Sequence, residues 1–205
     1  ISISIMGLLM IGVFKKNSEN LIYKLTMIVF LISFILLFNH PVHLSYTLFN
    51  ENYKIDYLST LMKSITLLSI FFVMISSHSY VKSIGINKIE YPILILSSVL
   101  GMLVTISSNE LITFYIGLEL QSLSLYVLAS FNRDNTKSTE AGLKYFVLSA
   151  LSSGLLLYGC SLIYGFTSTT NFDVISSNLY EFNTGEVFGI VFVLAGLSFK
   201  ISAVP

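Results

Sequence analysis

Residues 111–131 read LITFYIGLELQSLSLYVLASF, an apolar stretch whose single charged residue, Glu119, stands near its centre. About 20 helical residues cross the hydrocarbon core of a bilayer, so this stretch is long enough to span a membrane. An ionisable side chain inside hydrocarbon is costly, and membrane proteins that keep one generally use it to move ions or protons. The stretch therefore predicts a membrane helix with a functional carboxylate.

The composition of the whole chain also indicates an integral membrane protein. Hydrophobic residues make up 54% of the chain and charged residues 11%, with a mean hydropathy of +0.81. Soluble domains carry about 25% charged residues. The formal net charge of +0 gives no reason to expect nucleic acid as a partner. The single cysteine, Cys160, excludes an internal disulfide and a cysteine-based metal cluster.

Hydropathy predicts an all-α fold, a polytopic membrane bundle of about seven transmembrane helices. The candidate helices lie at residues 1–14, 21–38, 57–77, 91–108, 111–131, 138–164 and 187–205. We expect residues 1–90 to form three N-terminal helices and residues 91–205 to form a second unit. The connection at 166–186 is rich in Ser, Thr and Asn, which favours a solvated loop.

Basic residues are distributed unevenly between the two sets of connections. One lysine, Lys54, follows an even-numbered helix, whereas the basic residues in or beside the connections after odd-numbered helices are Lys15, Lys16, Lys24, Lys82, Lys88, Arg133 and Lys137. Loops rich in Lys and Arg stay on the cytoplasmic or matrix side of a membrane. We therefore expect the N-terminus on the opposite, outer side.

Two lysines join Glu119 as candidates for proton transfer. At 1.5 Å per residue, Glu119 lies about 14 Å from the outer boundary and Lys200 about 21 Å. Lys144 lies about 9 Å from the inner boundary. These depths allow the three charges to share one layer, and they predict that Glu119 lies within a few Å of Lys144 or joins it through water.

Each of these residues also has a purely structural interpretation. Glu119 can be half of a structural ion pair, or a neutral carboxyl that holds two helices together. Lys144 can pair with Glu140 one turn earlier and extend its ammonium to the headgroups. Lys63 is expected to reach outward in the same way, near Asp56.

Polar residues accompany Glu119 on one face of its helix. Tyr115, Ser122 and Tyr126 stand at helical spacing from it, so they are expected to support a polar path.

On the next helix, the pairs Ser149/Ser153 and Ala150/Gly154 have the spacing of close helix contacts. In the last segment, Gly185, Gly189, Gly196 and Pro205 predict an interrupted helix, which in membrane proteins points to an ion site. The histidines lack ligand spacing, and no metal site is predicted.

Several blocks resemble a known family. They are NELITFYIGLELQSLSLYVL at 109–128, STEAGLKYFVL at 138–148, LSSGLLLYG at 151–159 and FKISAVP at 199–205. They are similar to helices five, six and seven of NADH dehydrogenase subunit 2, the antiporter-like membrane subunit of respiratory complex I. The resemblance implies an N-terminal half of an antiporter-like inverted-repeat fold, in which residues 91–205 begin the first repeat and end in a broken seventh helix.

The resemblance assigns roles to three residues. It implies that Glu119 is the helix-five carboxylate, Lys144 the helix-six lysine and Lys200 the lysine beside the break. A carboxylate close to a lysine stabilises its charged form, whereas desolvation favours the neutral form, so small movements can switch the lysine between holding and releasing a proton.

The resemblance further implies a proton-translocating subunit that takes part in NADH:ubiquinone reduction without redox chemistry of its own. NADH, FMN, iron–sulfur clusters and ubiquinone would bind other subunits, so this chain is expected to hold no cofactor. Its expected partners are other membrane-arm subunits, lipids and a second polypeptide that completes the fold after Pro205. The expected location is the mitochondrial inner membrane, with the N-terminus on the intermembrane-space side.

Two other functions remain open at this stage. One is a subunit of a bacterial multi-subunit cation/proton antiporter. The other is a structural half-subunit that braces a membrane arm without transport.

Overall fold

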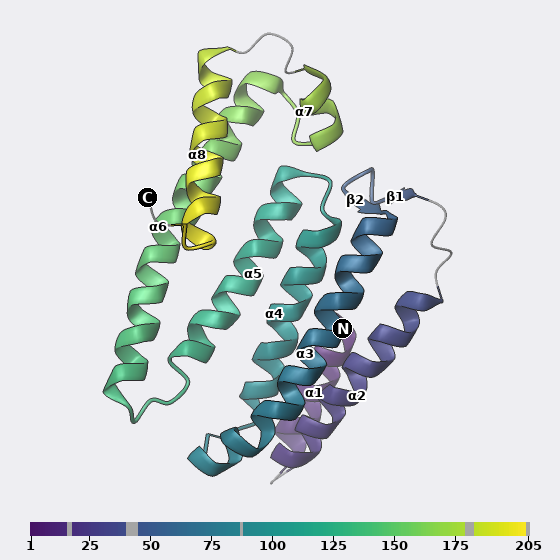
Figure 1. Ribbon diagram of the computed structural model, residues 1–205, viewed down its shortest axis with the longest axis vertical. Helices are drawn as coiled ribbons and strands as arrows, with labels where there is room; N and C mark the ends of the chain where they lie inside the picture. The colour runs from purple at the N-terminus through teal and green to yellow at the C-terminus, as the bar shows by residue number, and fades with distance from the viewer. Residues whose placement is uncertain (16–17, 40–44, 87, 179–182, 204–205) are drawn as a thin grey trace.

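The structure, a computed structural model, describes residues 1–15, 18–39, 45–86, 88–178 and 183–203, which form a bundle of long helices (Figure 1). The helices are α1 (Ser2–Phe14), α2 (Glu19–Phe38), α3 (Tyr57–Ile84), α4 (Glu90–Ser107), α5 (Leu111–Ala129), α6 (Thr136–Thr167), α7 (Phe172–Asn178) and α8 (Thr184–Lys200). The predicted apolar segments correspond to α1–α6 and α8. The helices α2, α3, α4, α5 and α6 are long and apolar enough to cross a membrane.

Two short elements are absent from the sequence prediction. An antiparallel hairpin of β1 (Tyr46–Leu48) and β2 (Tyr53–Ile55) precedes α3, with Leu48 opposite Tyr53. The helix α7 lies inside 166–186, which was predicted to be a solvated loop, and its Ile175 is buried in the core. Both elements depend on contacts with distant residues. The periodicity of their own sequence is too short to indicate them.

The connections alternate between the two ends of the bundle (Figure 1). The hairpin, the α4–α5 turn and α7 lie at one end, which we call the hairpin end. The connections that follow α1, α3 and α5 lie at the other end, which we call the basic end. Its basic residues include Lys15, Lys88 and Arg133 in or beside these connections and Lys137 at the start of α6. The chain therefore crosses the bundle in the alternating order that the positive charges predict.

Two groups of buried side chains hold the bundle together. The first includes Tyr23 and Phe30 of α2, Met74 of α3 and Leu96 of α4. The second lies around α6 and includes Leu156 and Ile163. The helix α4 packs both on α1–α3 and on α5, so it joins the N-terminal helices to the second unit.

Glycines bring α6 and α8 into close contact. A Cβ atom added to Gly159 would lie 2.7 Å from Val193 N and 2.8 Å from Gly189 O, and one added to Gly196 would lie 2.9 Å from Ser152 O. Close backbone approach of this kind is the usual basis of helix association in membranes. These glycines fix the depth at which α8 ends beside α6.

The small-residue contacts predicted on α6 are only half correct. Ser149 and Ser153 are buried. Ala150 and Gly154 are exposed, and a Cβ atom at Gly154 would meet nothing within 4 Å. Spacing alone identifies a stripe of small residues, but it does not say which stripe faces a neighbouring helix.

Candidate functional site

Glu119 lies at the middle of α5, and its carboxylate is held by side chains from two other helices. The Ser153 hydroxyl on α6 donates a hydrogen bond of 2.7 Å to Glu119 Oε2. The Lys200 ammonium on α8 lies 3.5 Å from the same oxygen. The side chains of Lys200 and Glu119 are 12% and 26% exposed. Three helices therefore meet at one carboxylate oxygen.

Lys200 is the last residue of α8, where the helix ends in a left-handed turn. Ser202 has φ +59°, and its N–H donates to Phe199 O at 3.1 Å, while Ala203 N–H donates to Ser198 O at 2.9 Å. This pair of bonds satisfies carbonyls that a helix end leaves without partners. The ammonium of Lys200 also lies at the negative end of the helix dipole. Pro205, which marks the predicted break, is outside the described residues.

The hairpin end of α8 is fixed by a capping box. Asn183 accepts a bond from the backbone of Glu186, whose own side chain accepts from Asn183 N at 3.4 Å. Glu186 is buried, with 5% exposure. The sequence Asn-Thr-Gly-Glu at 183–186 carries the spacing of this motif, so the start of α8 was recognisable from sequence.

Lys144 does not take part in the Glu119 contact. Its ammonium lies 2.6 Å from Glu140 Oε1, and the two side chains are 67% and 62% exposed. The direct contact predicted between Glu119 and Lys144 does not form, because Lys144 pairs with Glu140 one turn away and Lys200 lies beside Glu119. Depth did not identify the partner: Lys144 lies nine residues before Ser153, about 14 Å along α6 from the side chain that bonds Glu119, so Lys144 does not share the layer of Glu119 and Lys200.

The residues predicted to support a polar path do face the interior. Tyr126 is buried, its ring lies 4.8 Å from that of Tyr145, and its hydroxyl has no hydrogen-bond partner within the described residues. Ser122 is buried and donates to Leu118 O at 2.9 Å. Tyr115 packs against the apolar cluster around Leu156.

A large cavity adjoins the site. Its volume is about 1030 Å³, and it lies among α5, α6 and the end of α8. The polar side chains that line it are Gln121, Ser122, Tyr145, Ser149, Ser152, Ser198, Lys200 and Ser202. Ser152 Oγ is buried there without a partner among the described residues. The rest of the lining is apolar, so water in this volume would gather beside these polar side chains, where it could carry protons.

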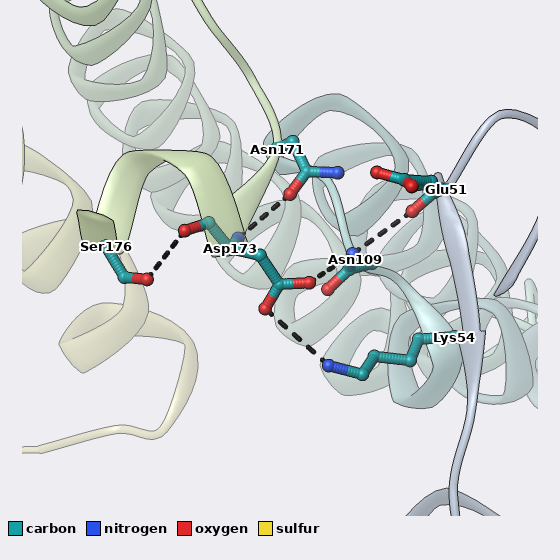
Figure 2. Close-up of polar contacts among 6 residues, drawn as sticks. All are labelled: Glu51, Lys54, Asn109, Asn171, Asp173 and Ser176. Atoms are coloured by element: carbon teal, nitrogen blue, oxygen red, sulfur yellow. Dashed lines mark hydrogen bonds and ion pairs between the residues drawn. The ribbon is translucent and has the colours of Figure 1, made fainter. Parts of the chain in front are cut away.

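At the hairpin end, polar contacts join three segments that are distant in sequence (Figure 2). Asn109 Nδ2 donates to Glu51 O and to Asp173 Oδ2, both at 3.1 Å. Asp173 also lies 3.6 Å from Lys54 Nζ, and its backbone N–H donates to Asn171 Oδ1 at 2.9 Å. We call Glu51, Lys54, Asn109, Asn171 and Asp173 the hairpin-end joint.

Main-chain bonds reinforce the hairpin-end joint. Asn109 N donates to Asn52 O at 2.9 Å, Phe172 N donates to Asn109 O at 3.0 Å, and Leu111 N donates to Thr170 O at 2.9 Å. Asn109 itself is 6% exposed. The joint therefore ties the first turn of α5 to the hairpin and to α7, which limits how far α5 can shift along its axis.

Lys63 is a second correction to the sequence analysis. It was expected to extend outward near Asp56, but it is buried, with 9% exposure, and its ammonium lies 5.2 Å from the centre of the Tyr53 ring. A cation over an aromatic face is stabilised by the ring quadrupole. Burial also raises the pKa of the Tyr53 hydroxyl, which donates to Leu103 O. The unpredicted hairpin, which carries Tyr53, covers Lys63.

Residues 108–205 match a family model described as NADH:quinone oxidoreductase/Mrp antiporter, transmembrane. The chain is 61% identical over 205 residues to NADH-quinone oxidoreductase subunit N of Pelagibacter ubique, covering 100% of this chain and 44% of that protein. Subunit N of Parvibaculum lavamentivorans is 47% identical over 210 residues, covering 100% of this chain and 43% of that protein. The chain thus spans less than half the length of these relatives.

Solved structures share the fold. A chain of respiratory complex I from Thermus thermophilus matches with a TM-score of 0.83 at 24% identity, covering 100% of this chain and 43% of that chain. A chain of the Mrp complex from Dietzia sp. matches with a TM-score of 0.78 at 20% identity, covering 100% and 40%. The antiporter-like helical fold predicted from sequence is confirmed. The chain belongs to the family of antiporter-like membrane subunits and is a homologue of the N-terminal part of NADH-quinone oxidoreductase subunit N.

Proposed function

We propose that this chain is part of a proton-translocating membrane subunit of NADH:quinone oxidoreductase, which couples quinone reduction to proton movement. The observation that carries the proposal is the ion pair of Glu119 and Lys200 in the middle of the bundle, at the point where α8 ends. A carboxylate and a lysine at this depth are costly to bury, and membrane proteins that keep such groups generally use them for transport. The names of the relatives, NADH-quinone oxidoreductase subunit N, support the same reaction.

The pair can work as a proton switch. While Glu119 lies beside Lys200, the negative charge stabilises the ammonium and the lysine holds its proton. When the two separate, desolvation favours the neutral form of Lys200, so the ammonium releases its proton to water in the adjoining cavity and becomes a neutral amine. Because Lys200 stands on the last turn of α8, a small displacement of that turn is enough to change the distance.

Other residues serve the same route in this proposal. Ser122, Tyr115 and Tyr126 line the interior around Glu119. Lys144 transfers protons nearer the basic end, where Glu140 stabilises its charged form until a proton moves on. This chain performs no redox step. NADH, FMN, iron–sulfur clusters and ubiquinone bind other subunits of the complex in this proposal.

The proposed partners are the other membrane-arm subunits and membrane lipids. The solved relatives, which come from multi-subunit membrane complexes, support the first of these. The proposed location is a respiratory membrane with the N-terminus outside. The sequence analysis named the mitochondrial inner membrane; the relatives above are bacterial proteins, which supports a respiratory membrane in general.

A role in a multi-subunit cation/proton antiporter has the support of the shared fold with the Mrp complex. The sequence relatives favour the oxidoreductase, because their identity to this chain is two to three times higher and they are named for it. A purely structural half-subunit accounts poorly for Glu119, since apolar residues would brace a bundle without the cost of burying charge.

The test is replacement of Glu119 in the assembled complex. Glu119→Gln keeps the shape and removes the charge, so we expect normal assembly and NADH oxidation that pumps at least several-fold fewer protons per electron. Glu19→Gln, at an exposed position of α2, is the matched control and leaves pumping unchanged. Proton uptake into vesicles, divided by the rate of NADH oxidation, measures the effect. Wild-type pumping in Glu119→Gln contradicts the proposed function.

A further inference from the structure

The Ser153 hydroxyl donates to a side chain of another helix, whereas most serine hydroxyls in the membrane helices bond within their own helix. Serine hydroxyls such as those of Ser122 and Ser161 donate to a carbonyl three or four residues earlier in their own helix. This is the default for serine in an apolar helix. Ser153 instead donates across to α5, to Glu119 Oε2, a residue 34 positions earlier in sequence. Ser153 is 5% exposed, so water does not compete well for this bond.

Ser153 and Lys200 share one oxygen of Glu119. Both contact Oε2, at 2.7 Å and 3.5 Å, and no hydrogen bond to Oε1 occurs among the described residues. A proton that arrives therefore finds its acceptor at Oε1. We propose that Ser153 is a positioning residue that anchors Glu119 in its charged and its neutral form, so that only the Lys200 contact is exchanged as protons pass. This inference rests on the proposed function.

The chemistry of the two contacts explains the difference. When water delivers a proton, an O–H bond of hydronium breaks, an O–H bond forms at Oε1, and a water molecule is left. Oε2 then becomes the carbonyl oxygen of a neutral acid and still accepts the hydrogen bond from Ser153. The attraction between Glu119 and the Lys200 ammonium is lost with the charge. Lys200 can then move into the cavity that it lines, while Glu119 stays in place.

The same contacts set the proton affinity of the carboxylate. A hydrogen bond to the charged form is stronger than one to the neutral form, so the Ser153 hydroxyl favours ionised Glu119. The pumping of a variant without that hydroxyl should therefore fall off earlier as the medium is acidified.

The experiment compares Ser153→Ala, Ser153→Thr and Ser161→Ala in the assembled complex, with pumping measured across pH. In Ser153→Ala, the acid side of the pumping profile should move to higher pH, because a hydrogen bond to a charged group is lost. Ser153→Thr keeps a hydroxyl and the wild-type profile. Ser161→Ala removes an exposed hydroxyl of the same helix and changes nothing.

A spectroscopic readout separates positioning from mere packing. The carboxyl stretching band that Glu119→Gln removes from the infrared difference spectrum should shift in Ser153→Ala and stay in place in Ser161→Ala. If Ser153→Ala does not assemble, Ser153→Cys, which has a weak donor of similar size, is expected to show a shift in the same direction.

The two proposals fail in different ways. An unshifted pH profile and infrared band in Ser153→Ala, or in Ser153→Cys if that variant is used, overturns the role of Ser153. A Ser153→Thr profile that matches Ser153→Ala also overturns it. If either result accompanies loss of pumping in Glu119→Gln, the proposed function stands. If Glu119→Gln pumps normally, the proposed function fails and the role of Ser153 fails with it.

Discussion

At the scale of single residues, the two candidate lysines have different surroundings. Lys200 is 12% exposed and lies beside Glu119, whereas Lys144 is 67% exposed and lies beside Glu140. Removing one partner of a buried ion pair costs about 3–5 kcal/mol, because the other charge is left unpaired. An exposed helical pair one turn apart is worth about 0.3–0.5 kcal/mol. The two lysines should therefore differ strongly in their sensitivity to substitution.

We predict that Lys200→Met lowers proton pumping by about tenfold or more. Methionine cannot carry a proton, so the change between paired and unpaired lysine is lost, and Glu119 is left without its buried partner. Lys144→Met, with the same change in side chain, should cause a clearly smaller loss. The measurement is NADH-driven proton uptake per assembled complex. Combining Lys200→Met with Glu119→Gln should restore part of any assembly defect, because no buried charge remains unpaired. Equal losses in Lys200→Met and Lys144→Met would contradict this assignment.

For Glu119, the sequence predicted the position of the residue but not its partners. The interior position of Glu119 followed from its place in an apolar run and from the polar stripe beside it. Its partners did not, because the packing of α5, α6 and α8 decides which lysine and which hydroxyl reach Glu119. Ser153 was seen only as a small residue at a contact. Nothing in its spacing indicates that its hydroxyl bonds across helices and not to its own backbone.

At the scale of helices, the close contact of α6 and α8 fixes the position of Lys200. Gly159 meets the backbone of α8, whereas Gly154 on another face of α6 meets nothing within 4 Å. The two glycines belong to one helix and lie five residues apart, so substituting each by alanine isolates the effect of the contact. Backbone atoms, unlike the ends of side chains, cannot yield without moving a whole helix.

Gly159→Ala should lower the melting temperature of the subunit in the assembled complex by several degrees and reduce pumping, because α8 must move away from α6. Gly154→Ala should leave both unchanged or raise the melting temperature slightly, since alanine favours a helix by up to about 1 kcal/mol over glycine. A thermal melt followed by size-exclusion chromatography measures the stability. A Gly159→Ala variant as stable as wild type would show that the helices can separate at no cost.

The long helices were largely predictable from the sequence, whereas the β1–β2 hairpin and the short helix α7 were not. Hydropathy over about 20 residues marks a membrane helix with little ambiguity. The hairpin and α7 have no such run. They form because Tyr53 pairs with Ser108 and Ile175 enters the core of the second unit, contacts with residues far away in the sequence.

At the scale of the whole molecule, the two ends of the bundle differ in charge. Connections at the basic end carry Lys88 and Arg133, whereas the joint at the hairpin end contains Glu51 and Asp173. Positively charged connections remain on the inner side of the membrane. The hairpin should therefore face the outer side, as the sequence predicts for the connections that follow even-numbered helices.

Cysteine labelling tests this orientation. Asn50→Cys, in the hairpin turn, should react with a membrane-impermeant maleimide added to intact spheroplasts or mitoplasts. Asp134→Cys, in the α5–α6 connection, should react only after the membrane is permeabilised. Both positions are exposed, and the native Cys160 is buried, so it contributes little background. Labelling in the reverse order would invert the proposed orientation.

The hairpin-end joint has a consequence for how such proteins diverge. Main-chain hydrogen bonds reinforce this joint. They run from Asn109 N to Asn52 O, from Phe172 N to Asn109 O and from Leu111 N to Thr170 O. Every residue except proline supplies the same donor and acceptor. Mutations can therefore accumulate at these positions over evolutionary time while the helices keep their register. The Thermus thermophilus chain keeps the same fold at 24% identity, with a TM-score of 0.83.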